Sequence, residues 1–149
     1  MKIQPYLNFD GDCAEALRHY ADVLGGELHI TTFGESPGGD QMPESERDRV
    51  MHARLSVGDQ VLMASDAPRG RYQKPAGSYV SIMLDDAAEA RRIFDALRDG
   101  AEIQMPFEAT FWSPGFGMLT DRWGTPWMVN TMSPADASSA GQTAGAAAG

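Results

Sequence analysis

An internal repeat constrains this chain most strongly, because two copies of one sequence pattern are expected to fold into two copies of one structural unit. The pattern recurs at a fixed offset of 74 residues, the separation between Asp12 and Asp86. A single match between two helix starts means little, but seven matches keep this offset. The matching pairs are Asp12/Asp86, Ala14/Ala88, Glu15/Glu89, Ala16/Ala90, Arg18/Arg92, Tyr20/Phe94 and Gly26/Gly100.

The first copy is predicted to form a strand, a helix and three further strands. The first strand covers residues 3–9, and Asp12 with Glu15 then forms a capping box that starts the helix. Gly25 and Gly26 end the helix, and strands follow at 28–33, 50–57 and 60–65, the last two joined across Gly58. The predicted buried stripe of the helix is Leu17, Tyr20, Ala21 and Leu24.

The second copy repeats this order. A strand is predicted over 78–84, Asp86 caps a helix that Gly100 ends, and strands follow at 102–110, 117–120 and 126–131. The predicted fold is therefore α+β, with two tandem βαβββ modules over residues 1–66 and 78–132 and a linker over 67–77. The predicted buried stripe of the second helix is Ala90, Ile93, Phe94 and Leu97.

Two segments fall outside this pattern. Residues 34–48 are rich in Gly, Pro and charge, so we expect a mobile loop there, serving either as a lid or as an inert surface excursion. Residues 133–149 are a low-complexity run of small residues with little to bury, and we expect this tail to be disordered.

Charge and cysteine content exclude several classes of function. The net charge is −9, so the surface repels phosphate backbones and no nucleic-acid partner is expected. No apolar run is long enough to span a bilayer, and we expect no membrane partner. A single cysteine rules out an internal disulfide, and residues 1–12 lack the apolar core of a secretory signal. We therefore expect a cytoplasmic protein.

Two stretches carry a family resemblance: ALRHYADVLGG after the first capping box, and MPFEATFWSPGFGMLTDRWGTPWMVN near the end. With the two βαβββ units, they make the chain resemble the glyoxalase/bleomycin-resistance/dioxygenase proteins, also called the vicinal oxygen chelate superfamily, and within it the PhnB-like branch. This resemblance implies modules that form a curved mixed sheet around a cavity, often in a homodimer. In the superfamily's enzymes, a divalent metal in that cavity chelates two neighbouring oxygens of the substrate.

The resemblance also implies where metal ligands would lie. The corresponding positions in this chain are Gln4, Met63, Tyr79 and Met128, although the fixed offset alone would pair Gln4 with Ser78. Two thioethers, a phenol and an amide suit a hard divalent ion poorly. We therefore predict neither the usual metal centre nor any other cofactor, while a divalent metal held by other residues stays open. Whether the chain is an enzyme stays open with it.

Strand alternation gives an independent reading of the same positions. Ile3, Leu7 and Phe9 should face the helices, as should Met51, Ala53, Leu55 and Val57. The opposite side mixes polar donors with soft apolar groups, either as the lining of a small-molecule pocket or as a face wetted by water. Its predicted members are Gln4, Tyr6, Asn8, His52, Arg54, Met63, Ser65, Tyr79, Ser81, Met128 and Asn130.

Several side chains of this chain have two readings each. His52 is either a catalytic base or metal ligand, or a hydrogen-bonded strand histidine, and Arg54 either binds an anionic ligand or pairs with an acidic neighbour. Trp112 and Phe116 either close one end of the cavity and contact ligand or pack at a dimer contact. Cys13 at the helix start is either structural or reactive, while His19 and His29 are read as solvated surface.

Three functions fit these observations. The first is a homodimeric protein that binds a small, anionic ligand without metal, in the manner of bleomycin-resistance proteins. The second is a lyase- or dioxygenase-type enzyme that uses His52, with or without a metal. The third is a dimeric module whose cavity is vestigial. The poor ligand set favours the first and third functions over the second.

Overall fold

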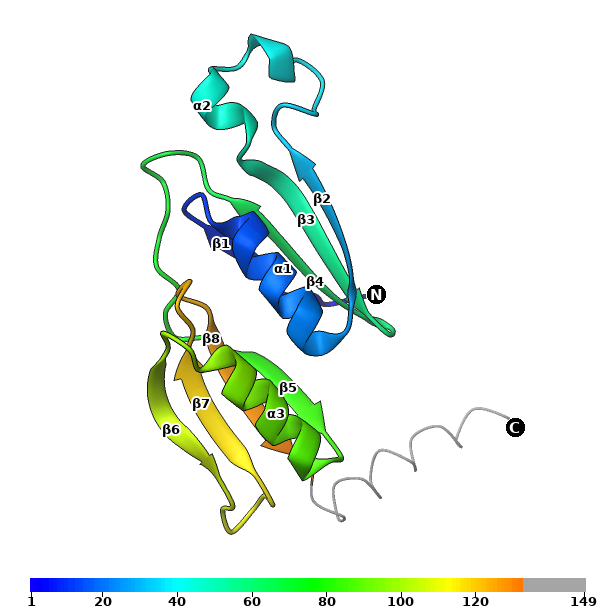
Figure 1. Ribbon diagram of the computed structural model, residues 1–149, viewed down its shortest axis with the longest axis vertical. Coiled ribbons are helices and arrows are strands. Elements are labelled where there is room, and N and C mark those ends of the chain that lie inside the picture. Colours follow the sequence, from blue (N-terminus) through cyan, green and yellow to red (C-terminus); the bar gives the residue numbers. More distant parts are fainter. Residues whose placement is uncertain (133–149) are drawn as a thin grey trace, which may run out of the picture. The chain divides into compact units, whose positions relative to one another are not determined.

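The computed structural model of the chain describes residues 1–132, so the predicted tail, 133–149, lies outside the described residues. The chain divides into two compact units, Met1–Lys74 and the residues from Pro75 onward. Each unit contains one long helix that lies against one face of a four-stranded sheet (Figure 1). Among the helices of residues 1–132, none is both long and apolar enough to cross a membrane.

The first unit is a βαβββ module whose four strands follow the spatial order β1-β4-β3-β2. Only the β1–β4 pairing is parallel, as expected for two strands separated by a helix and a hairpin. Two short helices, η1 (Gly39–Gln41) and α2 (Glu44–Arg47), interrupt the path from β2 to β3. The main elements are β1 (Tyr6–Phe9), α1 (Cys13–Leu24), β2 (Glu27–Thr32), β3 (Val50–Val57) and β4 (Gln60–Asp66).

The second unit repeats the topology, with spatial order β5-β8-β7-β6 and a parallel β5–β8 pair. The predicted pair of βαβββ modules is therefore confirmed. Strand pairing within residues 1–132 gives two separate four-stranded sheets and no closed barrel. The elements of the second unit are β5 (Val80–Leu84), α3 (Ala87–Leu97), β6 (Glu102–Glu108), β7 (Phe116–Thr120) and β8 (Pro126–Thr131).

Strand register shows how the two copies correspond. Tyr6 pairs with Met63 and Ser81 pairs with Met128, while Phe9 and Leu84 are the last residues of β1 and β5. The first strands therefore match at an offset of 75 residues, although the helices match at 74. The reason is a strand-to-helix connection that is one residue shorter in the second unit. The register thus matches Gln4 with position 79 and not with Ser78.

The core of the first unit lies between α1 and the sheet. Its helical stripe is rotated from the predicted one, because Val23 is buried while Ala21 and Leu24 are only half-buried. Ile3, predicted to face the helix, is exposed because it precedes β1. The buried helix residues are Cys13, Ala16, Leu17, Tyr20 and Val23, against Phe9, Val50, Ala53, Leu55 and Ala64.

A register shift corrects one further prediction in β3. Met51 was expected to face α1 with Ala53, but its side chain is exposed and Val50 is buried in its place. The pairing with β2 shifts between Thr31 and Thr32, where the partner moves from His52 to Val50. Such a bulge interrupts the alternation of buried and exposed residues at one point of the strand. A two-residue period read from the sequence does not reveal this interruption.

The core of the second unit contains the predicted stripe of α3, since Ala90, Ile93, Phe94 and Leu97 are all buried. A Cβ on Gly117 would lie 2.7 Å from Phe94 Cε2 and 3.0 Å from Phe107 Cα, so only glycine lets β7 approach these groups. Buried Asp121 shapes the turn into β8, accepting hydrogen bonds from the backbone N–H groups of Trp123 and Thr125 and from Trp127 Nε1.

The start of α1 is capped differently from the prediction. The side chain of Asp12 makes no capping hydrogen bond. Buried Asp66, at the end of β4, instead accepts hydrogen bonds from the backbone N–H groups of Gly11, at 2.8 Å, and Cys13, at 3.1 Å. Its second carboxylate oxygen accepts from Val50 N at 2.7 Å. In the second unit the prediction is confirmed, because the Asp86 side chain accepts from Ala88 N and Glu89 N.

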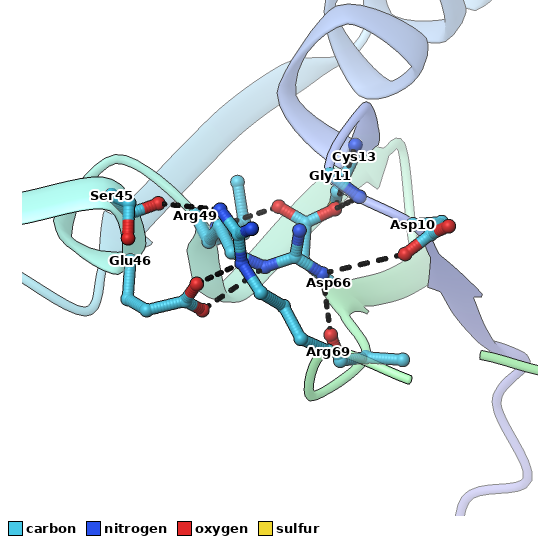
Figure 2. A network of polar contacts seen from close by, with 10 residues as sticks. Asp10, Gly11, Cys13, Ser45, Glu46, Arg49, Asp66 and Arg69 are labelled. Carbon is cyan, nitrogen blue, oxygen red and sulfur yellow. Dashed lines mark hydrogen bonds and ion pairs between the residues drawn. The ribbon is translucent and has the colours of Figure 1, made fainter. Parts of the chain in front are cut away.

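An arginine lies next to this cap and joins it to α2 (Figure 2). Arg49 donates to the carbonyl oxygen of Ala67 at 2.6 Å and lies 3.6 Å from a carboxylate oxygen of Glu46. Glu46 also forms an ion pair with Arg69, which donates to the carbonyl oxygen of Ser45. These contacts connect the segment after β4 to the segment before β3.

Residues 34–48, predicted as a loop without regular structure of its own, form the short helices η1 and α2 and make internal contacts. The guanidinium of Arg47 donates to the carbonyl oxygens of Asp40, at 2.7 Å, and Met42, at 3.1 Å. Buried Gly39 leaves no room for a side chain, since a Cβ there would lie 2.3 Å from Phe33 O. The two suggested roles, lid and inert excursion, both stay predictions.

Candidate functional site

The sheet of the first unit has a helix-free face that is rich in polar side chains. Residues paired across neighbouring strands point to the same side of a sheet. The pairs Tyr6–Met63, Met63–Arg54 and Arg54–His29 therefore form one row across all four strands. We define the polar face as this row and its neighbours, namely Tyr6, Asn8, His29, Thr31, His52, Arg54, Met63 and Ser65.

His52 has a partner that sequence reasoning did not assign. The hydroxyl of Tyr6 lies 3.3 Å from His52 Nδ1, and the two ring centroids are 5.9 Å apart. When the phenol donates this hydrogen bond, Nδ1 is the acceptor and the imidazole carries its proton on Nε2. The two side chains come from β1 and β3, which are not neighbours in the sheet, so only the tertiary fold brings them together.

Arg54 supplies the permanent positive charge of the polar face. Its exposed guanidinium Nε donates a hydrogen bond to Ser56 Oγ at 3.4 Å, and no carboxylate of residues 1–132 pairs with it. His29 lies beside Arg54 on β2 and forms a 3.0 Å contact with Glu27. The side chain of His29 is exposed, as predicted, and it lies on the same face of the sheet as Arg54.

The remaining predicted residues of this unit lie around the same face. Ser65 Oγ donates to Asn8 Oδ1 at 3.3 Å, between the paired strands β1 and β4. Gln4 precedes β1 and is half-buried. Strand alternation predicts Tyr6, Asn8 and Ser65 on the helix-free side, and the strand register places them there.

The second unit presents a different helix-free face, which we call the methionine face. Cross-strand pairs put Met105, Met118, Met128 and Ser81 in one row over β6, β7, β8 and β5. The next row contains Glu108, Phe116, Asn130 and Met83. Alternation predicts Ser81, Met128 and Asn130 on this side. Met105 and Met118 are not among the predicted residues, and in β6 the register shifts on both sides of Met105 break strict alternation.

Aromatic residues border the methionine face. The ring of Trp112 lies 5.7 Å from that of Phe116 and 4.7 Å from that of Phe111, both edge-on. Tyr79 precedes β5 and is exposed. The Oδ1 atom of Asn130 is buried and has no hydrogen-bond partner among the described residues.

The positions that the family resemblance assigns to metal ligands do not suit a hard divalent ion. Gln4 and Met63 belong to the first unit, whereas Tyr79 and Met128 belong to the second. Within residues 1–132, no group of three or more His, Cys, Asp or Glu side chains is placed to hold a metal ion. We therefore derive no chemical step through a divalent metal.

The thiol of Cys13 is buried at the start of α1. Burial raises the pKa of this thiol above its ordinary value of 9.0, and the carboxylates of Asp66 and Asp12 raise the pKa further. A thiol held in its protonated form is a poor nucleophile. Of the two readings of Cys13, the structural one therefore fits the geometry.

A family model and a curated relative both match most of this chain. The family model described as 3-demethylubiquinone-9 3-methyltransferase matches residues 1–130. The protein YjdN of Escherichia coli K12 is 35% identical over 147 residues, covering 89% of this chain and 96% of YjdN.

Several solved structures have a similar fold. The protein PA1353 of Pseudomonas aeruginosa is 46% identical with a TM-score of 0.81, covering 89% of this chain and 98% of that one. A PhnB protein of Bacillus cereus shares the fold at 23% identity, with a TM-score of 0.73 and coverage of 88% and 99%. A glyoxalase/bleomycin resistance protein/dioxygenase family enzyme of Burkholderia phytofirmans shares it at 12% identity, with a TM-score of 0.58 and coverage of 86% and 97%.

Proposed function

Because this chain belongs to the family described as 3-demethylubiquinone-9 3-methyltransferase, in the PhnB-like branch of the vicinal oxygen chelate superfamily, we propose that it binds a small anionic molecule without a divalent metal. The proposed site is the polar face of the first unit. The family description names a methyl transfer, whereas the residues of the polar face support the binding of an anion. The predicted ligand contacts Tyr79, Ser81, Trp112, Phe116, Met128 and Asn130 are not needed for it and stay predictions.

The observation that carries this proposal is the guanidinium of Arg54 on the inner strand β3, which forms no ion pair with any carboxylate of residues 1–132. A guanidinium presents five N–H donors in a plane and binds carboxylates and phosphates with two parallel hydrogen bonds. His52 and the Tyr6 hydroxyl add donors on the same face. Since the whole chain has a net charge of −9, an anion gains from a local cluster of donors that compensates the general repulsion.

A ligand panel tests the proposal. Thermal shifts and calorimetry would compare inorganic phosphate, methylphosphonate and benzoate with neutral benzamide, in metal-free buffer. A ligand present at about 100 times its Kd stabilises the folded state by about 2.7 kcal/mol, enough to raise the Tm by several degrees. Arg54→Gln should remove the response to the anions, whereas Arg71→Gln, outside the polar face, should keep it. A flat response of the native protein would support the vestigial module instead.

One contact also favours a second candidate, an enzyme in which Tyr6 and His52 move a proton. The 3.3 Å contact between the Tyr6 hydroxyl and His52 Nδ1 has the geometry of an oriented acid–base pair. For a compound found to bind, His52→Gln should abolish conversion to product, while it weakens binding far less than Arg54→Gln does. If the native protein leaves every bound compound chemically unchanged, the enzymatic candidate fails and the binding function stands.

We further propose that the chain forms a homodimer in the cytoplasm, as its family resemblance and its single cysteine suggest. The mass of one chain is 16.1 kDa. Light scattering at micromolar concentration should give twice this mass, and a value for one chain would contradict the proposed dimer.

A further inference from the structure

The methionine face contains a donor set for which the proposed function has no use. Met105, Met118 and Met128 are cross-strand partners on three adjacent strands, with register shifts in β6 on both sides of Met105. Directly paired residues have Cα atoms about 4.5–5.5 Å apart, so the three side chains leave the sheet next to one another. Met118 and Met128 are half-buried, and Met105 on the edge strand is exposed, which leaves the row open to solvent on one side.

We propose that Met105, Met118 and Met128 bind Cu(I) through their three thioether sulfurs. Thioethers are soft ligands that select Cu(I) over hard cations. A methionine side chain has three rotatable bonds, so neighbouring side chains can turn their sulfurs toward a common ion. A cation with one charge also needs no carboxylate to neutralise it, in contrast to the divalent ions that the family's enzymes use.

The two sides of the same sheet differ in a way that supports a role for sulfur. Where β7 and β8 pack against α3, the buried side chains are Leu119, Trp127 and Val129, which are branched or aromatic. On the helix-free side, the same two strands place methionine at Met118 and Met128. A surface that only had to be apolar could use leucine or valine at these positions, because both pack well and leave no flexible, oxidisable atom exposed.

The site is independent of the polar face and of the cysteine. Arg54 and His52 belong to the first unit, and the methionine row belongs to the second. The thiol of Cys13 is buried and holds its proton, so it does not compete for the ion from solvent. Failure of anion binding would therefore leave the Cu(I) proposal untouched, and failure of Cu(I) binding would leave the anion proposal untouched.

Titration of the full-length protein tests the proposal. Under anaerobic conditions with excess reductant, a chromogenic Cu(I) chelator should lose one equivalent of Cu(I) to the protein. Met118→Leu and Met105→Leu should each weaken binding at least tenfold, while Met51→Leu, at an exposed methionine of the first unit, and Cys13→Ala should bind as the native protein does. Zn(II) should not compete. Absence of binding, or equal binding in all five proteins, would overturn the proposal.

Methyl NMR locates the ion and shows that the variants are folded. Protein labelled with ¹³C at the methionine methyl groups would be titrated with Ag(I), a soft cation that does not change its oxidation state. The signals of Met105, Met118 and Met128 should shift together and saturate at one equivalent. The methyl signal of Met63 should keep its position. Selective shifts at other methionines, or simultaneous shifts of all nine, would contradict the assigned site.

Discussion

Asp66 Oδ1 lies 3.1 Å from the backbone nitrogen of Cys13 and accepts its hydrogen bond, although the two residues are 53 positions apart in the sequence. The same oxygen accepts from Gly11, and the other carboxylate oxygen accepts from Val50. One buried side chain thus satisfies backbone donors from the start of α1 and the start of β3.

Replacing Asp66 with alanine should lower the free energy of unfolding by about 3 kcal/mol. The substitution removes the acceptor of three backbone N–H groups, of which those of Cys13 and Val50 are buried, and each buried loss costs about 1–3 kcal/mol in isolation. Asp66→Asn retains one acceptor oxygen and should lose less. Urea unfolding followed by circular dichroism gives both values.

Asp12→Ala is the matched control for this experiment. Asp12 is the residue that the capping-box pattern nominates, but its side chain makes no capping hydrogen bond. Burial raises the pKa of this carboxyl above its ordinary value, so its charge does not favour the fold. We expect a much smaller loss of stability than for Asp66→Ala, and an equal loss would show that Asp12 caps α1 in solution.

Cys13 should make the protein less stable as the pH rises above 9. The folded chain keeps the thiol proton, because burial raises its pKa, while the unfolded chain loses the proton near 9.0. The unfolded state then binds fewer protons, so stability falls by up to about 1.4 kcal/mol per pH unit between these two pKa values. Urea unfolding at pH 8, 9 and 10 should show a shallower decline in Cys13→Ala, and identical slopes would contradict the assignment.

Arg47→Ala should loosen the segment that contains η1 and α2. Its guanidinium binds the carbonyl oxygens of Asp40 and Met42, which otherwise have to be hydrated. We expect faster amide hydrogen exchange and faster proteolysis within residues 34–48, with a small change in global stability. Arg71→Ala, outside this segment, is the control and should leave the exchange pattern as it is in the native protein.

Gly117→Ala should destabilise the second unit by about 2 kcal/mol, because a methyl group at this position overlaps the ring of Phe94 and the backbone of Phe107. Gly70→Ala has open space around its Cβ and only a backbone penalty from its φ of +74°. That control should cost less, about 1 kcal/mol. Equal losses would mean that α3 moves away from β7 without penalty.

Much of this fold follows from local pattern. The repeat and the alternation of apolar residues predict both modules. Asp86 caps α3 by accepting a hydrogen bond from a backbone N–H only two residues further along the chain. The cap of α1 could not be predicted in this way, because Asp66 reaches it only after the β3–β4 hairpin has formed. The bulge at Thr31 and Thr32 hides the burial of Val50 for the same reason, since it depends on the partner strand.

In the candidate site, too, the features that depend on one strand can be predicted and those that depend on several strands cannot. Alternation within one strand places Tyr6 and Arg54 on the helix-free side without reference to any other strand. The contact between Tyr6 and His52 and the row of three methionines depend on strand order and register, which a single sequence does not specify. The sequence therefore predicts which face of the sheet a residue occupies more readily than it predicts which residues contact one another.

The two helix caps also imply an order of events during folding. The acceptor for α3 lies next to it in the chain, so this helix can be capped as soon as it forms, whereas α1 waits for closure of a loop of more than fifty residues. We therefore expect pulse-labelled amides of α3 to gain protection early, and those of α1 only when β3 and β4 are paired. Two halves with one topology would in this way fold by different routes.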